Sequence, residues 1–158
     1  MEAIRRGAEG LWQWGEAMSE LPYNKTVEED CLGGLMVCTY YLSDPEYKDY
    51  LSPHDFYIRR HQRIYKAMQD LTARDIEPHE INVKTELQRT GILNQVGGRE
   101  YIRHLVYCAL SRPGERGFDP CNTIAIVRDY RLRRDALIKA QGLAQAALDY
   151  SKPLQVTP

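Results

Sequence analysis

An uninterrupted helical run toward the end of the sequence constrains the fold more than any other feature. The run begins with Asp119 as a capping residue and Pro120 at the first helical position, and only Gly142 interrupts it before about Tyr150. About 28 residues at 1.5 Å each predict a helix of roughly 40 Å. One apolar stripe follows it: Ile124, Val127, Tyr130, Leu137, Ile138, Ala144 and Leu148. A helix of this length with one apolar face usually pairs with another helix, from the same chain or from a partner.

A shorter amphipathic segment begins near residue 26. Thr26 is a candidate cap, and Glu29 lies three residues further on, as in a capping box. The apolar positions of this segment recur at helical spacing: Val27, Cys31, Leu35 and either Met36 or Cys38. Gly33 and Gly34 lie inside the predicted helix, where they either allow another helix to approach closely or mark a local kink.

A second helix start is predicted at Ser52, which precedes Pro53 and an acidic Asp55 in the first turn. The inner face that follows contains His61, Ile64, Tyr65, Met68 and Leu71, and the outer face contains Arg59, Arg60, Arg63 and Lys66. The basic face is interpreted as solvated, with a phosphate-contacting surface as the alternative. A histidine on an apolar face, such as His61, is more often a satisfied core residue than a ligand.

Two further short helices are predicted before the long one. The first spans Glu80 to Arg89, with Ile81, Val83 and Leu87 inward and Gly91 as its end. The second follows Gly97 and Gly98 and places Tyr101, Ile102, Leu105 and Ala109 on one face. The glycine pair is not a phosphate-binding loop of the G-x-x-x-x-G-K-[ST] type, because Arg99 and Glu100 follow it and no Gly-Lys dipeptide occurs in the chain. Flexible or left-handed backbone before a helix is the remaining interpretation.

These segments together predict an all-α fold. Residues 1–20 are expected to form a tail that is partly helical at most, and residues 21–112 a compact head of about five or six helices. Residues 113–150 then provide a loop and the long helix, and residues 151–158 a second tail. A chain of 158 residues buries roughly 70% of its unfolded surface, so it needs neither a metal nor a disulfide to fold.

Composition restricts the possible functions. The 21 basic and 22 acidic residues give a net charge of −1, which provides no strong positive field for binding nucleic acid. The four cysteines lack C-x-x-C spacing and the four histidines lack metal-type spacing, so we expect free thiols and neither a metal site nor a catalytic site. With no signal peptide and no apolar run of about 20 residues, the sequence predicts a cytoplasmic protein without a membrane span.

Four segments, in order, resemble the N-terminal domain of the bacterial replicative helicase of the DnaB type: "LPYNKTVEEDCLGGLM", "LSPHDFYIRRHQRIYKAM", "LNQVGGREYIRHL" and "IVRDYRLRRDALI". The resemblance covers about residues 21 to 150. Thr26 and Val27 replace the acidic and alanine pair that the family usually has before the first helix, and the loop between Leu110 and Asp119 also departs in composition. These differences suggest a divergent lineage or a phage or plasmid relative.

The resemblance implies an architecture and a set of partners. In that family a helical head precedes a helical hairpin, hairpins pair, and three dimers form a collar on the hexameric ATPase ring. The long helix of this chain resembles the first arm of the hairpin, and the glycine pair resembles the junction before the last head helix. The motor, with its ATP and magnesium, is not in this chain, so the resemblance implies no catalysis, no cofactor and only indirect contact with DNA.

The family's collar also docks primase, which implies a second set of interface residues. Carried over by position, these residues are Tyr101, Leu137 and Leu143, for which core packing and hairpin packing are the alternatives. Self-association is expected to use the apolar stripe of the long helix: Ile124, Val127, Leu137, Ile138 and Leu148. The expected function is therefore assembly of helicase subunits and docking of primase or a loader. The alternatives are the helicase-binding domain of a primase and a free-standing helical loader or adaptor. A small helical enzyme is a further alternative, and an assay of nucleotide hydrolysis would distinguish it.

Overall fold

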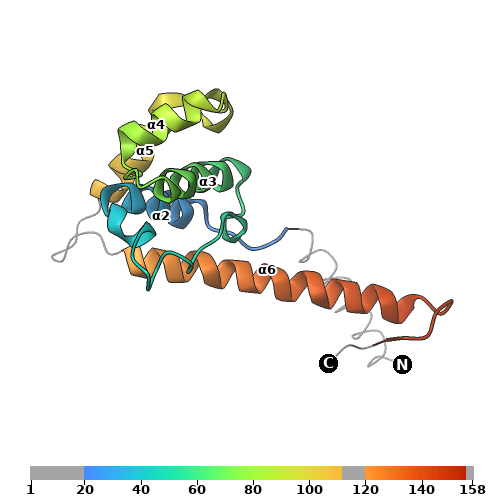
Figure 1. Ribbon diagram of the computed structural model, residues 1–158. Coiled ribbons are helices and arrows are strands. Elements are labelled where there is room, and N and C mark those ends of the chain that lie inside the picture. Colours follow the sequence, from blue (N-terminus) through green and yellow to red (C-terminus); the bar gives the residue numbers. More distant parts are fainter. Residues whose placement is uncertain (1–19, 112–119, 156–158) are drawn as a thin grey trace. The chain divides into compact units, whose positions relative to one another are not determined.

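The computed structural model describes residues 20–111 and 120–155 (Figure 1). Within these residues all regular structure is helical, so the predicted all-α class is confirmed. The α-helices are α2 (Lys25–Val37), α3 (Arg59–Ala73), α4 (Glu80–Arg89), α5 (Gly98–Leu110) and α6 (Pro120–Leu148). Three short 3-10 helices lie between them: η1 (Thr39–Leu42), η2 (Pro53–Asp55) and η3 (Asn94–Val96).

Residues 23–131 form one compact unit, and residues 20–22 and 132–155 belong to a second, so the division falls within α6. The predicted boundary between head and loop, at residues 112 and 113, and the predicted cap Asp119 both lie outside the described residues. Nearly all of the predicted tail at residues 1–20 lies outside them as well. These boundaries therefore stay predictions.

Helix α2 begins one residue before the predicted cap. Asn24, not Thr26, is the N-cap, and its Oδ1 accepts a hydrogen bond from the backbone N–H of Val27 at 3.1 Å. The prediction of Thr26 was wrong because Asn24 satisfies the same kind of orphan donor two residues earlier, which places Thr26 inside the helix. The predicted buried stripe is confirmed, since Cys31, Leu35 and Met36 are buried.

Helices α2 and α5 approach closely at Gly33. A Cβ atom on Gly33 would lie 1.9 Å from the backbone oxygen of Leu105 and 3.1 Å from the Cβ of Ala109. No side chain fits at such a distance, so the close-approach interpretation of this glycine is confirmed. Gly34 is buried on the same helix. The contact fixes the relative position of the two helices that carry most of the polar contacts described below.

Helix α3 begins later than predicted. Ser52 and Asp55 do start a helical turn, because the backbone N–H of Ser52 donates to Asp55 Oδ2, but this turn is only the 3-10 helix η2. The backbone is extended at Phe56 and at Ile58, and α3 starts at Arg59. The predicted inner face is confirmed, because all of its members are buried: His61, Ile64, Tyr65, Met68 and Leu71.

Helix α4 has the predicted bounds, but one predicted inward residue points outward. Val83 and Leu87 are buried as expected, whereas Ile81 is 68% exposed. Residues two positions apart on an α-helix lie about 200° apart around its axis, so Ile81 and Val83 cannot share a face. Lys84 and Glu86 are buried instead, each with an ion-pair partner.

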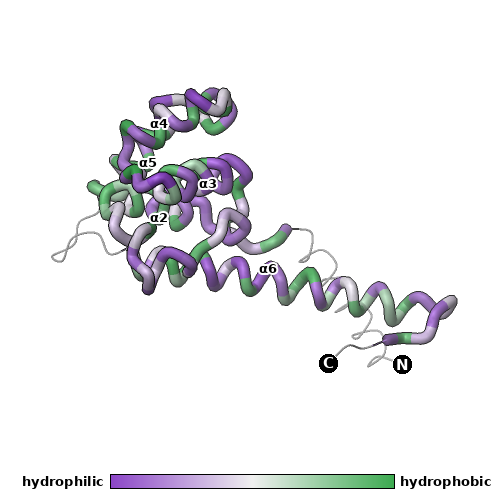
Figure 2. The backbone as a smooth tube through the Cα atoms, in the orientation of Figure 1, coloured by the Kyte–Doolittle hydropathy of each residue, from purple (hydrophilic) through white to green (hydrophobic). Residues whose placement is uncertain are grey.

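Helix α6 changes its surroundings along its length. Ile124 and Val127 lie in the hydrophobic core of residues 23–131. In the second unit Leu137 is half-buried, and Ile138 and Leu148 are exposed. Figure 2 shows hydrophobic residues recurring among hydrophilic ones along this helix. The expectation that Ile124 and Val127 mediate self-association is therefore corrected, because they already pack inside their own chain.

Candidate protein-interaction site

The structure does not assemble a metal site or a membrane span from the residues that it describes. Among residues 20–111 and 120–155, no three His, Cys, Asp or Glu side chains are placed to hold a metal ion together. In the same residues no helix combines the length and the apolar character needed to cross a bilayer. The sites that can be built from these residues are therefore a polar cluster in the head and the apolar surface of α6.

The polar cluster is centred on Tyr101, one of the residues predicted to contact a partner. Its hydroxyl donates to Glu29 Oε1 at 2.9 Å and lies 2.6 Å from His61 Nε2. The guanidinium carbon of Arg60 lies 3.9 Å above the centre of its ring, which is cation–π geometry. The ring also covers Gly97, where a Cβ atom would come within 2.8 Å of the Cβ of Tyr101. Tyr101 is half-buried, so part of its ring remains accessible.

His61 links this tyrosine to a buried carboxylate. His61 is fully buried, and its Nδ1 lies 2.6 Å from Glu28 Oε2. Glu28 also accepts the backbone N–H groups of Tyr57 and Ile58, at 2.6 and 3.3 Å. A carboxylate on α2 thus satisfies the backbone donors of the two residues that precede α3.

Sequence reasoning missed the acidic part of this cluster. Glu28, Glu29 and Asp30 are consecutive in the sequence, and all three are buried. Three consecutive residues span about 200° of a helix, which fits on the polar side of an amphipathic helix, so their spacing gave no signal of burial. Glu29 was interpreted only as a capping residue. Burial and the hydrogen bond to Glu29 raise the pKa of the Tyr101 hydroxyl, so the phenol keeps its proton.

The predicted basic face of α3 divides in two. Arg59 and Lys66 are exposed, and Lys66 pairs with Asp70 at 2.6 Å, as expected for a solvated face. Arg60 is half-buried over Tyr101, with its Nε buried. Arg63 donates to Gln95 Oε1, in η3. The side of α3 that carries Arg60 therefore belongs to the Tyr101 cluster.

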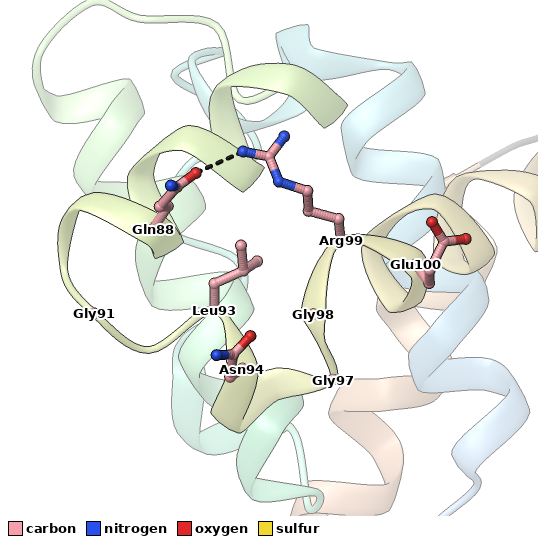
Figure 3. A pocket seen from close by; sticks show the side chains of 8 residues that line it. All are labelled: Gln88, Gly91, Leu93, Asn94, Gly97, Gly98, Arg99 and Glu100. Carbon is pink, nitrogen blue, oxygen red and sulfur yellow. Dashed lines mark hydrogen bonds between the residues drawn. The ribbon is translucent and has the colours of Figure 1, made fainter.

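The glycine pair forms a helix junction, as predicted. Gly97 and Gly98 have φ angles of 109° and 74°, values that favour glycine, and they join η3 to α5. An open hollow of about 480 Å³ lies beside them (Figure 3), and Arg99 donates to Gln88 Oε1 across it. A Cβ atom on Gly98 would meet nothing within 4 Å, so the backbone conformation, and not space, selects glycine there.

The other predicted interface residues lie on the part of α6 that belongs to the second unit. Ile138, Leu143 and Leu148 are 52%, 48% and 73% exposed, while Leu137 is half-buried. Leu137 and Leu148 are 11 residues apart, which is close to three full turns, so they share one side of the helix. Leu143 is six residues from Leu137 and lies about 120° away around the axis. Leu132, which is also exposed, is 11 residues before Leu143 and shares its side.

Comparison with known proteins defines the class of this helical domain. The profile described as the DnaB-like helicase N terminal domain matches residues 20–113, which is more than half of the chain. The chain therefore belongs to the family of DnaB-like helicase N-terminal domains, and the predicted family is confirmed.

Individual proteins agree with this assignment. The chain is 32% identical over 85 residues to the replicative DNA helicase DnaB of Mycobacterium leprae, a match that covers 54% of this chain and 14% of that protein. It is 30% identical over 84 residues to the replicative DNA helicase DnaB of Leifsonia xyli, with 53% and 18% covered. The chain thus matches less than a fifth of the length of these two relatives.

A solved structure has the same fold. The crystal structure of the N-terminal domain of DnaB helicase from Mycobacterium tuberculosis superimposes with a TM-score of 0.71 at 26% identity. The similarity covers 84% of this chain and 91% of that one. The family profile ends at residue 113. The structural match covers more of this chain than residues 21–112 contain, so it extends beyond the predicted head.

Proposed function

We propose that this chain is a non-catalytic assembly and docking domain of a replicative DNA helicase. In this role it pairs with a second copy of itself, contributes to the collar of a helicase hexamer, and docks primase or a helicase loader. It contacts DNA only indirectly, needs no cofactor of its own and acts in the cytoplasm. The family match favours the helicase over the primase as the parent protein. ATP and magnesium belong, in this proposal, to a motor domain that the matched family does not include.

The exposed apolar residues of α6 are the observation that carries the proposal. Fully burying one leucine or isoleucine side chain contributes roughly 1.5 to 3 kcal/mol. Leu137, Ile138 and Leu148 from each of two copies contribute at most roughly 9 to 18 kcal/mol, since Leu137 is already half-buried. Association costs an estimated 4 to 15 kcal/mol in rigid-body freedom. The two ranges overlap, so we expect a dimer whose population depends on protein concentration.

Sedimentation velocity over a wide range of concentrations tests self-association. We expect the wild-type chain to pass from monomer to dimer, and Ile138→Asp, Leu148→Asp and Leu137→Asp each to shift the balance to monomer while the head stays folded. Leu143→Asp is the matched control, because it places the same charge on another side of the same helix. A wild-type chain that remains monomeric at the highest concentrations would exclude pairing.

Docking of primase is proposed for two separate positions, Tyr101 in the unit of residues 23–131 and Leu143 in the second unit. Tyr101 offers a half-exposed aromatic ring backed by Arg60, and aromatic and arginine side chains are typical of the residues that dominate binding energy at interfaces. Leu143 lies on the side of α6 that is away from Leu137 and Leu148. One copy could therefore use separate sides of this helix for self-association and for primase.

Calorimetric titration with the primase of the same organism tests both proposed docking positions. We expect Leu143→Asp and Tyr101→Ala to weaken binding at least tenfold, which corresponds to about 1.4 kcal/mol or more. Tyr101→Phe keeps the ring and should bind normally, and Leu148→Asp should lose the dimer but keep the primase contact. Unchanged primase affinity in both Leu143→Asp and Tyr101→Ala would reject both positions as primase contacts. Nucleotide hydrolysis by the isolated chain should not exceed background, and measurable turnover would reject a non-catalytic role.

A further inference from the structure

Four side chains from three helices form one continuous chain of hydrogen bonds in the head. Glu28 contacts His61 Nδ1 at 2.6 Å, His61 Nε2 contacts the Tyr101 hydroxyl at 2.6 Å, and this hydroxyl contacts Glu29 at 2.9 Å. We call these four residues the proton chain. Glu28 and Glu29 come from α2, His61 from α3 and Tyr101 from α5. The proton chain therefore joins three helices through three contacts.

Each of the three contacts needs one proton between its two heavy atoms. A neutral histidine provides one ring proton, and a tyrosine hydroxyl provides one. An ionised carboxylate only accepts, so two ionised glutamates provide none. Two protons cannot fill three contacts, and the unfilled contact would set two lone pairs against each other at less than 3 Å. The observed geometry is satisfied only when the proton chain holds a third proton.

The surrounding groups do not remove this requirement. Lys25 and His104 lie 3.7 and 3.9 Å from Glu29, beyond ordinary hydrogen-bond distance, so neither replaces the contact from Tyr101. Arg60 lies over the Tyr101 ring and provides a positive charge. Asp30, which follows Glu29 on α2, is also buried. The negative charges of the two glutamates in the proton chain favour retention of an added proton.

We propose that the proton chain binds one proton more than its neutral-histidine form and acts as a pH-sensitive clasp between α2, α3 and α5. The added proton is held as a second ring proton on His61, as a carboxyl proton on Glu29 or as a carboxyl proton on Glu28. All three arrangements fill the three contacts and leave the four residues with the same net charge, because they differ only in which atom of each pair holds the proton. Loss of the proton breaks one contact of the clasp.

The clasp has a defined effect on folding at neutral and alkaline pH. An unfolded histidine loses its charge near pH 6.5, and unfolded glutamates are already ionised there. Between about pH 7 and the pH at which the clasp releases its proton, the folded chain therefore holds one proton more than the unfolded chain. Stability falls as pH rises wherever the folded state binds more protons. One proton corresponds to a tenfold increase in the unfolding equilibrium constant per pH unit.

Denaturant unfolding of the wild-type chain and of Tyr101→Phe between pH 6 and pH 9 tests the clasp. The variant keeps the aromatic ring and loses both contacts of the hydroxyl, so it no longer needs the third proton. We expect the unfolding constant of the wild type to rise up to tenfold more per pH unit than that of the variant above pH 7. Equal pH dependence in the two proteins would overturn the proposal. His79→Gln is the control for ordinary histidine titration and should keep the wild-type dependence.

Nuclear magnetic resonance on the wild-type chain decides the question without any substitution. With ¹⁵N-labelled histidine and ¹³C-labelled glutamate at pH 7.5, the proposal expects two ring protons on His61 or a protonated carboxyl on Glu28 or Glu29. A His61 ring with one proton beside two ionised glutamates would overturn it. Because this measurement uses the native protein, it stands even where a variant fails to fold.

Discussion

The side chain of Asn24 provides the acceptor for the first turn of α2. Its Oδ1 accepts from the backbone N–H of Val27, one of the four donors that a helix leaves unpaired at its start. We expect Asn24→Ala to lower the free energy of unfolding by about 1 kcal/mol, within the usual range for such caps. Thr26→Ala is the control: Thr26 lies inside the helix, where alanine is the better helix former, so the free energy should not fall. Urea unfolding measures both. Equal losses in the two variants would mean that the cap is misassigned.

A second residue-scale prediction concerns the carboxylate of Glu86. Hydrogen bonds from Arg89, together with Arg74, lower the pKa of Glu86 to about 2. Arg89 approaches with two nitrogens, at 3.0 and 2.7 Å, and Arg74 approaches at 2.7 Å. Both arginines are themselves well exposed to water, which limits the gain. We expect Glu86→Gln to cost about 1 kcal/mol at neutral pH.

The pH dependence of this contact follows from the lowered pKa. The folded chain releases the Glu86 proton more readily than the unfolded chain, whose carboxyl has the ordinary value of 4.5. The stabilisation is therefore present above about pH 4.5 and is lost as pH falls toward about 2. Thermal unfolding of Glu86→Gln should approach that of the wild type over this range, whereas the exposed Glu77→Gln should follow the wild type at every pH. A constant difference between Glu86→Gln and wild type down to pH 2 would contradict this assignment.

At the scale of helices, the contact between α2 and α5 depends on the absence of one side chain. A methyl group on Gly33 would overlap the backbone oxygen of Leu105, and backbone cannot move aside as a flexible side chain can. We expect Gly33→Ala to destabilise the chain by about 1 to 3 kcal/mol or more, despite the better helix propensity of alanine. Chemical denaturation provides the measurement.

Gly142→Ala is the matched control for this helix contact. Gly142 also lies inside a helix, but a Cβ atom there would meet nothing within 4 Å. The same substitution should therefore stabilise the chain by about 0.5 to 1 kcal/mol, through backbone entropy alone. Opposite signs for the two variants are the expected result. A stabilising Gly33→Ala would show that the two helices do not approach as described.

At the scale of the whole molecule, self-association should appear in the stability of the chain. A partner that binds only the folded state raises the unfolding temperature as its concentration rises. We therefore expect the unfolding temperature of the wild type to increase with protein concentration, and that of Ile138→Asp to be constant. Differential scanning calorimetry at several concentrations measures this effect, with Leu143→Asp as the variant that keeps the wild-type behaviour. The same constant temperature in all three proteins would argue against a dimer.

The sequence by itself determined the helical class, the family and most of the buried faces. The inner face of α3, the bounds of α4 and the glycine junction before α5 all follow from local patterns: apolar spacing near 3.6 residues and the backbone freedom of glycine. These signals lie within one helix or one turn, so they can be detected without knowing how the helices pack. The partners of α6 in a complex stay a prediction, since periodicity identifies an apolar face and does not identify what covers it.

Only the tertiary structure decided which polar groups meet. Glu28 accepts N–H groups 29 and 30 positions further along the chain, from the two residues that precede α3, and α3 starts at Arg59 and not at the predicted Pro53. Tyr101 contacts residues 40 and 72 positions away, and Ile124 and Val127 join the core of the head, although the sequence analysis assigned them to another copy. The physical reason is that a hydrogen bond or a buried contact between distant segments depends on where packing places both of them, and the spacing of residues along one helix carries no information about the other.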